Sequence, residues 1–268
     1  MNGARVLLAI AVLACMVGLL RFGSEGWGPL FAWLWTEGGY DEAGALAALR
    51  NAGWCGVGLA LLAPFRPLGL LGLPLAAWCG AWCAATLWQR EAFAELAPAL
   101  QATRFTAPLG LALLAATPAR PGSVRMLTAA ALLCCASAAT FAAHGLEAYT
   151  GHGEFLDFLF LLARELELAL AESTARGVLL VIAALDVAAA LGALLALRWR
   201  RARLALAWMG AWGLATAALR LFAYGSAFYA DFLVRLPNAC VPLAALALLR
   251  ARDRQRAEHL ALDASSTR

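Results

Sequence analysis

Long apolar stretches dominate this sequence of 268 residues and restrict what it can fold into. A helix that crosses the hydrocarbon core of a bilayer needs about 20 mostly apolar residues. Eight segments meet that requirement, and we expect each to span a membrane: 5–22, 44–63, 68–89, 97–117, 125–143, 174–197, 203–223 and 232–250. The sequence therefore predicts an all-α polytopic membrane protein.

The composition and the motif inventory agree with this prediction. Hydrophobic residues make up 63% of the chain and charged residues 14%, against about 45–50% and about 25% in soluble domains. The net charge of +4 is small, and no basic patch indicates binding to nucleic acid. The seven cysteines have no spacing typical of a zinc or haem site, so we expect no metal. No Ser-His-Asp arrangement or phosphate-binding loop is visible, which argues against a soluble hydrolase.

The distribution of arginine predicts the orientation of the chain, because cytoplasmic loops are enriched in basic residues. Arginines concentrate in the short loops 64–67 and 198–203 and in the polar tail 251–268, so we expect both termini to be cytoplasmic. The tail itself is expected to be frayed. Two longer outer connections, 23–43 and 144–173, are aromatic and too short to span. They are typical of amphipathic helices that lie in the outer interface.

Two segments 130 positions apart have nearly the same sequence. AWCGAWCAATLWQR at 77–90 and AWMGAWGLATAALR at 207–220 agree at eight of fourteen places. We therefore expect two parallel repeats, each a four-helix bundle with one interfacial segment in its outer loop. The first repeat covers 1–118 and the second 124–250, followed by the tail.

The first apolar run also has an alternative interpretation as a secretion signal, because VLAC at 12–15 resembles a lipoprotein cleavage box. However, LACMVGLLRF at 13–22 aligns with LLCCASAATF at 132–141. A segment with an internal counterpart belongs to the fold, so the first run is interpreted as the first membrane helix.

The repeated segment carries a stripe of side chains at four-residue spacing. On a helix this spacing places Trp208, Trp212, Thr216 and Arg220 along one side, from mid-membrane to the outer interface. The counterparts in the first half are Trp78, Trp82, Thr86 and Arg90. Helix packing explains the tryptophans and the intervening glycines. The two arginines either extend to the headgroups or form a buried ion pair or an anion-binding spot.

Three further polar residues are candidates for function. Glu25 aligns with His144 near the outer surface, and a histidine beside a carboxylate can handle protons or simply tie helix ends together. Asp186 lies near the middle of the sixth span, where an acid costs about 2.5–3.5 kcal/mol to insert. Its counterpart by the same offset is Gly56. We expect Asp186 to face the interior, either as a proton or ligand site or as a structural hydrogen-bond partner.

The pattern resembles the DoxX-like group of small bacterial membrane proteins. The resemblance is mainly architectural, with a long loop after the first helix, a tight hairpin between the second and third, and an arginine near the outer end of the third. It also includes His144-Gly145, Asp186 and the Trp212-Gly213…Thr216…Arg220 run. This chain departs from simple members by being doubled, with Glu25 and Gly56 in the first half. The resemblance implies a bacterial inner membrane and a pocket for a quinone or lipid. Members have been linked to quinone-coupled sulfur oxidation, to membrane redox complexes and to assembly.

The sequence thus predicts a binding or accessory protein with an outer-leaflet cavity between the halves that holds a quinone or a lipid. The residues assigned to this site are His144, Asp186, Trp208, Trp212, Thr216, Arg220, Glu25 and Arg90. No catalytic residue is assigned. Three alternatives remain open: a redox subunit that uses the quinone with a partner complex, a proton-coupled transporter with Asp186 as the coupling acid, and a membrane-protein assembly factor.

Overall fold

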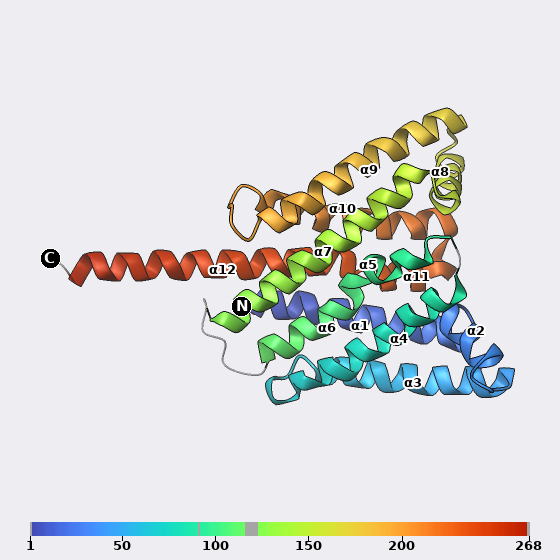
Figure 1. Cartoon of the computed structure of the whole chain (residues 1–268), viewed down its shortest axis with the longest axis horizontal. Helices are drawn as coiled ribbons and strands as arrows, with labels where there is room; N and C mark the ends of the chain where they lie inside the picture. The colour runs from blue at the N-terminus through green and yellow to red at the C-terminus, as the bar shows by residue number, and fades with distance from the viewer. Residues whose placement is uncertain (1, 91, 116–122, 267–268) are drawn as a thin grey trace.

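The computed structural model describes residues 2–90, 92–115 and 123–266. The end of the expected span 97–117 and the boundary between the expected repeats lie outside these residues. The described chain is helical and contains no strand, which confirms the all-α prediction (Figure 1). Seven of its helical segments are long and apolar enough to cross a membrane.

The first half begins with a long helix, a short helix and a helical hairpin, and ends with a broken helix. Its elements are α1 (Asn2–Ser24), α2 (Pro29–Thr36), α3 (Glu42–Leu62), η1 (Arg66–Leu71), α4 (Gly72–Gln89), η2 (Ala94–Leu96), α5 (Ala97–Leu100) and α6 (Ala102–Ala115). The short α2 lies in the loop for which the sequence predicts an interfacial helix. Asp41 starts α3 as a side-chain cap, because its Oδ1 accepts a hydrogen bond from the Gly44 N–H at 2.8 Å.

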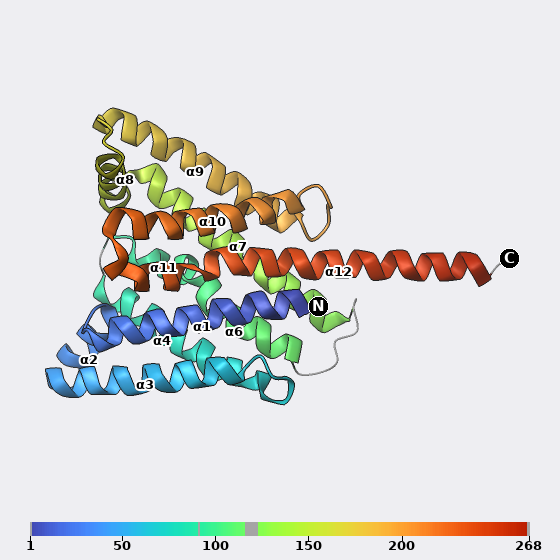
Figure 2. The same cartoon turned by 180° about the vertical axis from the view of Figure 1, so that it is seen from behind.

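The second half follows the same order of elements. They are α7 (Val124–Thr150), α8 (Gly153–Glu165), α9 (Glu172–Leu195), α10 (Arg203–Tyr224), η3 (Ser226–Phe228), α11 (Tyr229–Arg235) and α12 (Pro237–Ser266). α7 is longer than the expected span 125–143 and ends only at Gly151, which adopts a left-handed conformation with φ 67°. α12 continues as a helix to Ser266 and projects beyond the bundle (Figures 1 and 2). The expected fraying of the tail is therefore wrong.

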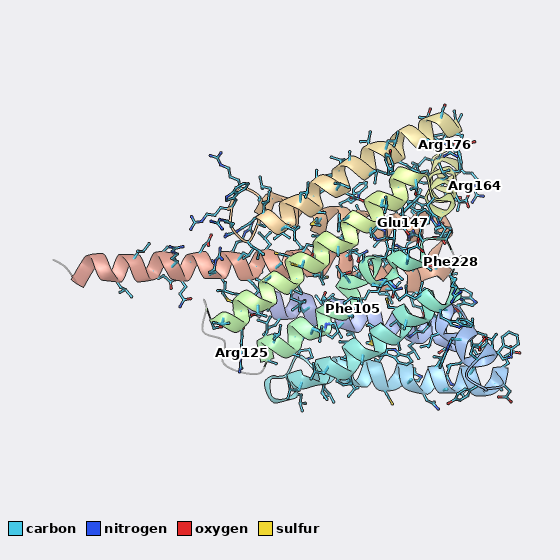
Figure 3. The ribbon with its side chains drawn as sticks, in the orientation of Figure 1. Phe105, Arg125, Glu147, Arg164, Arg176 and Phe228 are labelled. Carbon is cyan, nitrogen blue, oxygen red and sulfur yellow. The ribbon has the colours of Figure 1, made fainter. Side chains whose placement is uncertain are left out.

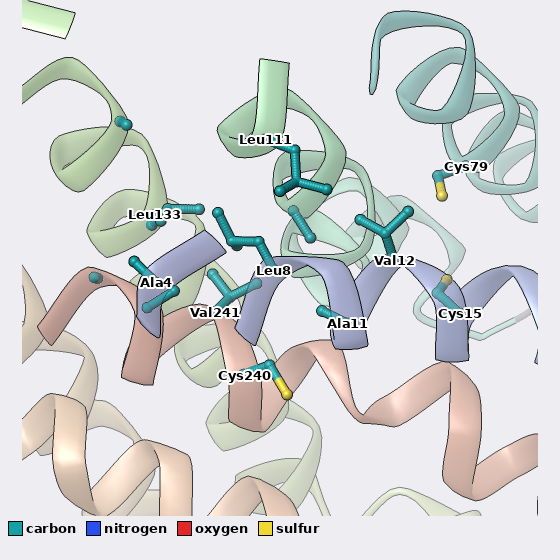
Figure 4. Packing of buried hydrophobic residues seen from close by; sticks show 14 of the residues in the cluster. Ala4, Leu8, Ala11, Val12, Cys15, Cys79, Leu111, Leu133, Cys240 and Val241 are labelled. Carbon is teal, nitrogen blue, oxygen red and sulfur yellow. The ribbon is translucent and has the colours of Figure 1, made fainter. Parts of the chain in front are cut away.

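Equivalent helices of the two halves make equivalent contacts. α1 packs on α3 as α7 packs on α9, α4 packs on α6 as α10 packs on α12, and α1 meets α12 as α7 meets α6. The helices α1, α6, α7 and α12 form the centre, with α3 and α4 on one side and α9 and α10 on the other (Figures 1 and 2). One apolar core joins the halves, because Leu8 and Val12 of α1 lie among Leu111, Leu133 and Val241 (Figure 4).

The expected fourth span, 97–117, is not one continuous helix of spanning length. α6 has 14 residues, which corresponds to about 21 Å of helix, against about 30 Å of bilayer hydrocarbon. It nevertheless runs back across the bundle toward the end where α7 begins (Figure 1). The described chain therefore has seven helical segments of spanning length, and the eighth expected segment is shorter.

The two ends of the bundle have different structures. One end gathers the short helices α2, α8 and α11, whereas the other holds the start of α1, the α9–α10 loop and the projecting part of α12 (Figure 2). At this second end Asp253 accepts hydrogen bonds from Arg203, with N–O distances of 2.5 and 3.2 Å, and pairs with Arg200 at 2.9 Å. These bonds fix the α9–α10 loop against α12.

Candidate ligand cavity in the second half

A cavity of about 230 Å³ lies among α7, α8, α9, α10 and the α11–α12 junction. All of its lining residues fall between positions 141 and 238. The sequence predicts a cavity between the halves, whereas the structure places this one inside the second half. Much of its wall is apolar and comes from α8 and α9, including Phe155, Phe158, Leu159, Leu162, Val178 and Ile182.

Five of the eight residues assigned from sequence line this cavity. They are His144 from α7, Asp186 from α9, and Trp212, Thr216 and Arg220 from α10. The four-residue spacing on α10 explains why three of them face the same space. The Thr216 hydroxyl donates to the carbonyl of Trp212 one turn earlier, at 3.0 Å, so it stays within its own helix.

Asp186 is a buried carboxyl group without a hydrogen-bond partner in the described chain. Its side chain lines the cavity, the residue is only 4% exposed, and no described group bonds to Oδ1. Gly145 places it there by letting α9 approach α7, because a Cβ at Gly145 would lie 3.1 Å from the Ala183 carbonyl oxygen. The other possibility was that Asp186 forms a structural hydrogen bond. Among the described residues, no such bond to its Oδ1 is present.

His144 has a carboxylate neighbour, but on its own helix. Its Nδ1 lies 3.2 Å from Oε2 of Glu147, which is buried on α7 near α8 (Figure 3). The His144 ring also meets the edge of Phe155, with 6.2 Å between ring centroids. The sequence analysis missed Glu147 as a partner. Its i,i+3 spacing from His144 was the signal, provided that the helix continued past position 143.

Arg220 reaches the cavity from within a helix. α10 continues four residues beyond it to Tyr224, and its guanidinium lies over the ring of Phe158, 5.3 Å from the centroid. Such a cation–π contact leaves the guanidinium N–H groups at the edge of the plane unused. Within the described residues Arg220 makes no ion pair.

Two polar residues that line the cavity, Arg235 and Asn238, were not assigned from sequence. Arg235 ends α11, and its buried Nε has no partner in the described chain. Asn238 lines the cavity while its Oδ1 accepts a hydrogen bond of 2.6 Å from Thr103 in the first half. Gly213 lets α10 lie directly on this junction, because a Cβ there would be 2.8 Å from the Asn238 carbonyl oxygen. Arg235 follows Arg104 by 131 positions, close to the 130-residue offset of the repeated segments, and this was the available signal.

Three residues assigned from sequence lie elsewhere. Glu25 pairs with Arg21 on the first half, and Arg90 ends α4 in a left-handed conformation with φ 52° and is exposed. Trp208 is 43% exposed and stacks on Trp212, with ring centroids 5.7 Å apart and planes 9° apart. Trp208 therefore contributes to the cavity only through its contact with Trp212.

The cavity combines an apolar wall with a small number of polar groups, which is the usual composition of a site for a small molecule. Among the described residues, no group of three or more His, Cys, Asp or Glu side chains is arranged to hold a metal ion. Comparisons of the sequence with protein-family models, with curated proteins and with solved structures find no match. The resemblance to the DoxX-like group therefore stays a prediction.

Proposed function

We propose that this chain is an integral membrane binding protein that holds one amphiphilic molecule, a quinone or a lipid, in the second-half cavity. The observation that carries the proposal is Asp186, a buried carboxyl group with an unbonded oxygen that faces an apolar cavity. A buried polar group without a partner costs about 1–3 kcal/mol. A ligand that bonds to Asp186 would remove that cost.

The size of the cavity limits how much of a ligand it can enclose. A cavity of about 150 Å³ in another protein accommodates benzene, so about 230 Å³ has room for a substituted ring or a short stretch of alkyl chain. A phospholipid with two full chains would leave most of its length outside, in the bilayer. The proposal is therefore a quinone ring, or the head or one chain segment of a lipid.

We further infer that the two halves are parallel repeats with eight crossings, in which α6 completes the first repeat. The matching element order and helix contacts support this arrangement. α1 begins and α12 ends at the same end of the bundle (Figure 1), and the arginines concentrate there. By the positive-inside rule this end is cytoplasmic, which places the cavity in the outer leaflet. The resemblance to DoxX-like proteins favours a bacterial inner membrane and a role beside a membrane redox complex.

Native mass spectrometry of the full chain in mild detergent tests the binding proposal. Ile182→Trp adds bulk to the cavity wall, and Val181→Trp, whose native side chain is 61% exposed on the same helix, is the matched control. We expect one bound quinone or lipid per chain in the native protein and in Val181→Trp, and loss of that ligand in Ile182→Trp. Equal amounts of bulk lipid on all three proteins would contradict the proposal.

A further inference from the structure

Arg220 and Arg235 line the cavity, and neither guanidinium pairs with a carboxylate among the residues that the structure describes. The guanidinium of Arg220 lies over the rings of Phe158 and Tyr224, and the buried Nε of Arg235 has no hydrogen-bond partner among the described residues. Neither forms an ion pair within the described chain. Arg104 of α6 and Arg220 both lie within electrostatic range of Arg235. Three cations therefore share this region, two of them facing the cavity.

Among the described residues, the nearby acids form no ion pair with Arg220 or Arg235. Asp231 and Glu154 influence Arg235 from α11 and α8, but neither is bonded to it. Glu147 is engaged with His144, and Asp186 forms no ion pair with either cavity arginine in the described part of the chain. Burying an uncompensated charge is costly in a protein and more so in a membrane, so this arrangement favours a negatively charged guest.

We propose that the polar end of the ligand is an acid group, a carboxylate or a phosphate, held by Arg220 and Arg235. Guanidinium groups bind both anions through paired, charge-assisted hydrogen bonds. The apolar part of the ligand lies against Phe155, Phe158 and Ile182, which line the same space. This inference rests on the proposed function and narrows its ligand to an anionic amphiphile.

Two probes of equal chain length separate charge from hydrophobic fit. Dodecanoate and 1-dodecanol are titrated into the purified full chain in a neutral detergent, and bound ligand is counted by native mass spectrometry. We expect dodecanoate to bind at least about tenfold more tightly than dodecanol, because two charge-assisted hydrogen bonds are lost with the alcohol. Arg220→Gln and Arg235→Gln should each abolish most of this preference.

Arg90→Gln is the matched control, because Arg90 is the counterpart of Arg220 and is exposed outside the cavity. It should keep the preference for dodecanoate. If Arg235→Gln, which removes a buried Nε, does not fold, Arg220→Gln alone decides, since Arg220 has ring contacts but no ion pair among the described residues.

The outcomes distinguish this inference from the proposed function. Equal affinity for the two probes, or a preference unchanged in Arg220→Gln, would overturn the acid-group inference while leaving an amphiphile site in place. Failure of both probes, with no co-purifying ligand, would contradict the proposed function itself. Competition by phosphatidylglycerol, but not phosphatidylcholine, in nanodiscs supports a lipid phosphate as the acid group. Dodecanoate binding that persists in both lipids supports a free carboxylate.

Discussion

The two halves have nearly the same tryptophan-rich helix, but they use it in opposite ways. In the first half Trp82 is 4% exposed and meets Trp78 edge to face, with planes 83° apart. In the second half Trp212 is only partly buried and lies flat on the exposed Trp208. Trp82 is turned into its half-bundle, whereas Trp212 forms part of a cavity wall.

The residues that face these tryptophans also differ between the halves. A Cβ at Gly56 would lie 4.0 Å from Cδ1 of Trp78, and one at Gly28 would lie 2.9 Å from Trp82. Gly28 therefore leaves room for the Trp82 indole, whereas a Cβ at Gly56 would be in ordinary contact with Trp78 and would crowd Met16, whose Sδ would lie 3.2 Å away. At the position equivalent to Gly56 the second half has Asp186. A change of one facing residue from glycine to aspartate thus accompanies the change from a packed interior to a polar cavity.

The arginines at the ends of the two helices differ for a backbone reason. α4 ends at Gln89, so Arg90 leaves the helix in a left-handed conformation and is exposed. α10 continues past Arg220 to Tyr224, which keeps Arg220 on the helix face that lines the cavity. Equivalent positions in the two repeated segments therefore place the Arg90 guanidinium on the surface and the Arg220 guanidinium at the cavity.

Removing the two tryptophans tests this contrast with the largest expected effect. Trp82→Ala should lower the free energy of unfolding by about 3–5 kcal/mol, because it leaves a cavity in a packed region. Trp212→Ala should cost about 1–2 kcal/mol, because its side chain is only partly buried. Thermal unfolding of both variants in the same detergent measures the difference. Equal losses would show that the two side chains have the same packing role.

Substitutions at Gly56 and Asp186, which occupy equivalent positions in the two halves, should give the next largest change in stability. Gly56→Asp should destabilise the chain by about 2.5–3.5 kcal/mol, because it buries an acid against Met16 and Trp78. Asp186→Asn should keep or raise the melting temperature of the ligand-free protein, because a carboxyl group without a partner contributes no stability. A large drop in the melting temperature of Asp186→Asn would show that Asp186 is a structural residue.

A smaller loss of stability is expected from a substitution at Gly213, where α10 lies on the start of α12. Gly213→Cys introduces the residue found at its first-half counterpart, Cys83, but its Cβ would meet the Asn238 backbone at 2.8 Å. Backbone cannot move aside like a flexible side chain, so we expect a loss of about 1–3 kcal/mol. The reverse change, Cys83→Gly, should cost less. The order of the two melting temperatures checks this, and an unperturbed Gly213→Cys would disprove the close approach.

The apolar runs of the sequence predict the membrane helices well but locate their ends less accurately. Hydropathy drops at His144, and the expected span therefore stops at position 143, whereas α7 continues to Thr150 because the first left-handed residue is Gly151. This extension places His144 and Glu147 on one helix, where they pair. The fourth expected span is broken near Gln101, so its apolar length overestimates its helical length.

The sequence predicts which side chains of the candidate site share one helix face, but it does not predict the cavity. Four-residue spacing correctly indicates that Trp212, Thr216 and Arg220 face one space, and a mid-membrane Asp186 indicates an interior position. Spacing does not give the side-chain rotamers or the facing residues, and these decide that the second half has the cavity. Arg235 contributes from a distant helix whose approach depends on tertiary packing.

The most direct test of the account is an experimental density map of the native chain in nanodiscs. The account predicts non-protein density between Asp186 and Arg220 in the second half, and the indole of Trp82 turned into the first half with no such density beside it. A second-half cavity filled by the Trp212 indole, or holding only water, would contradict the claim that this half carries the ligand site.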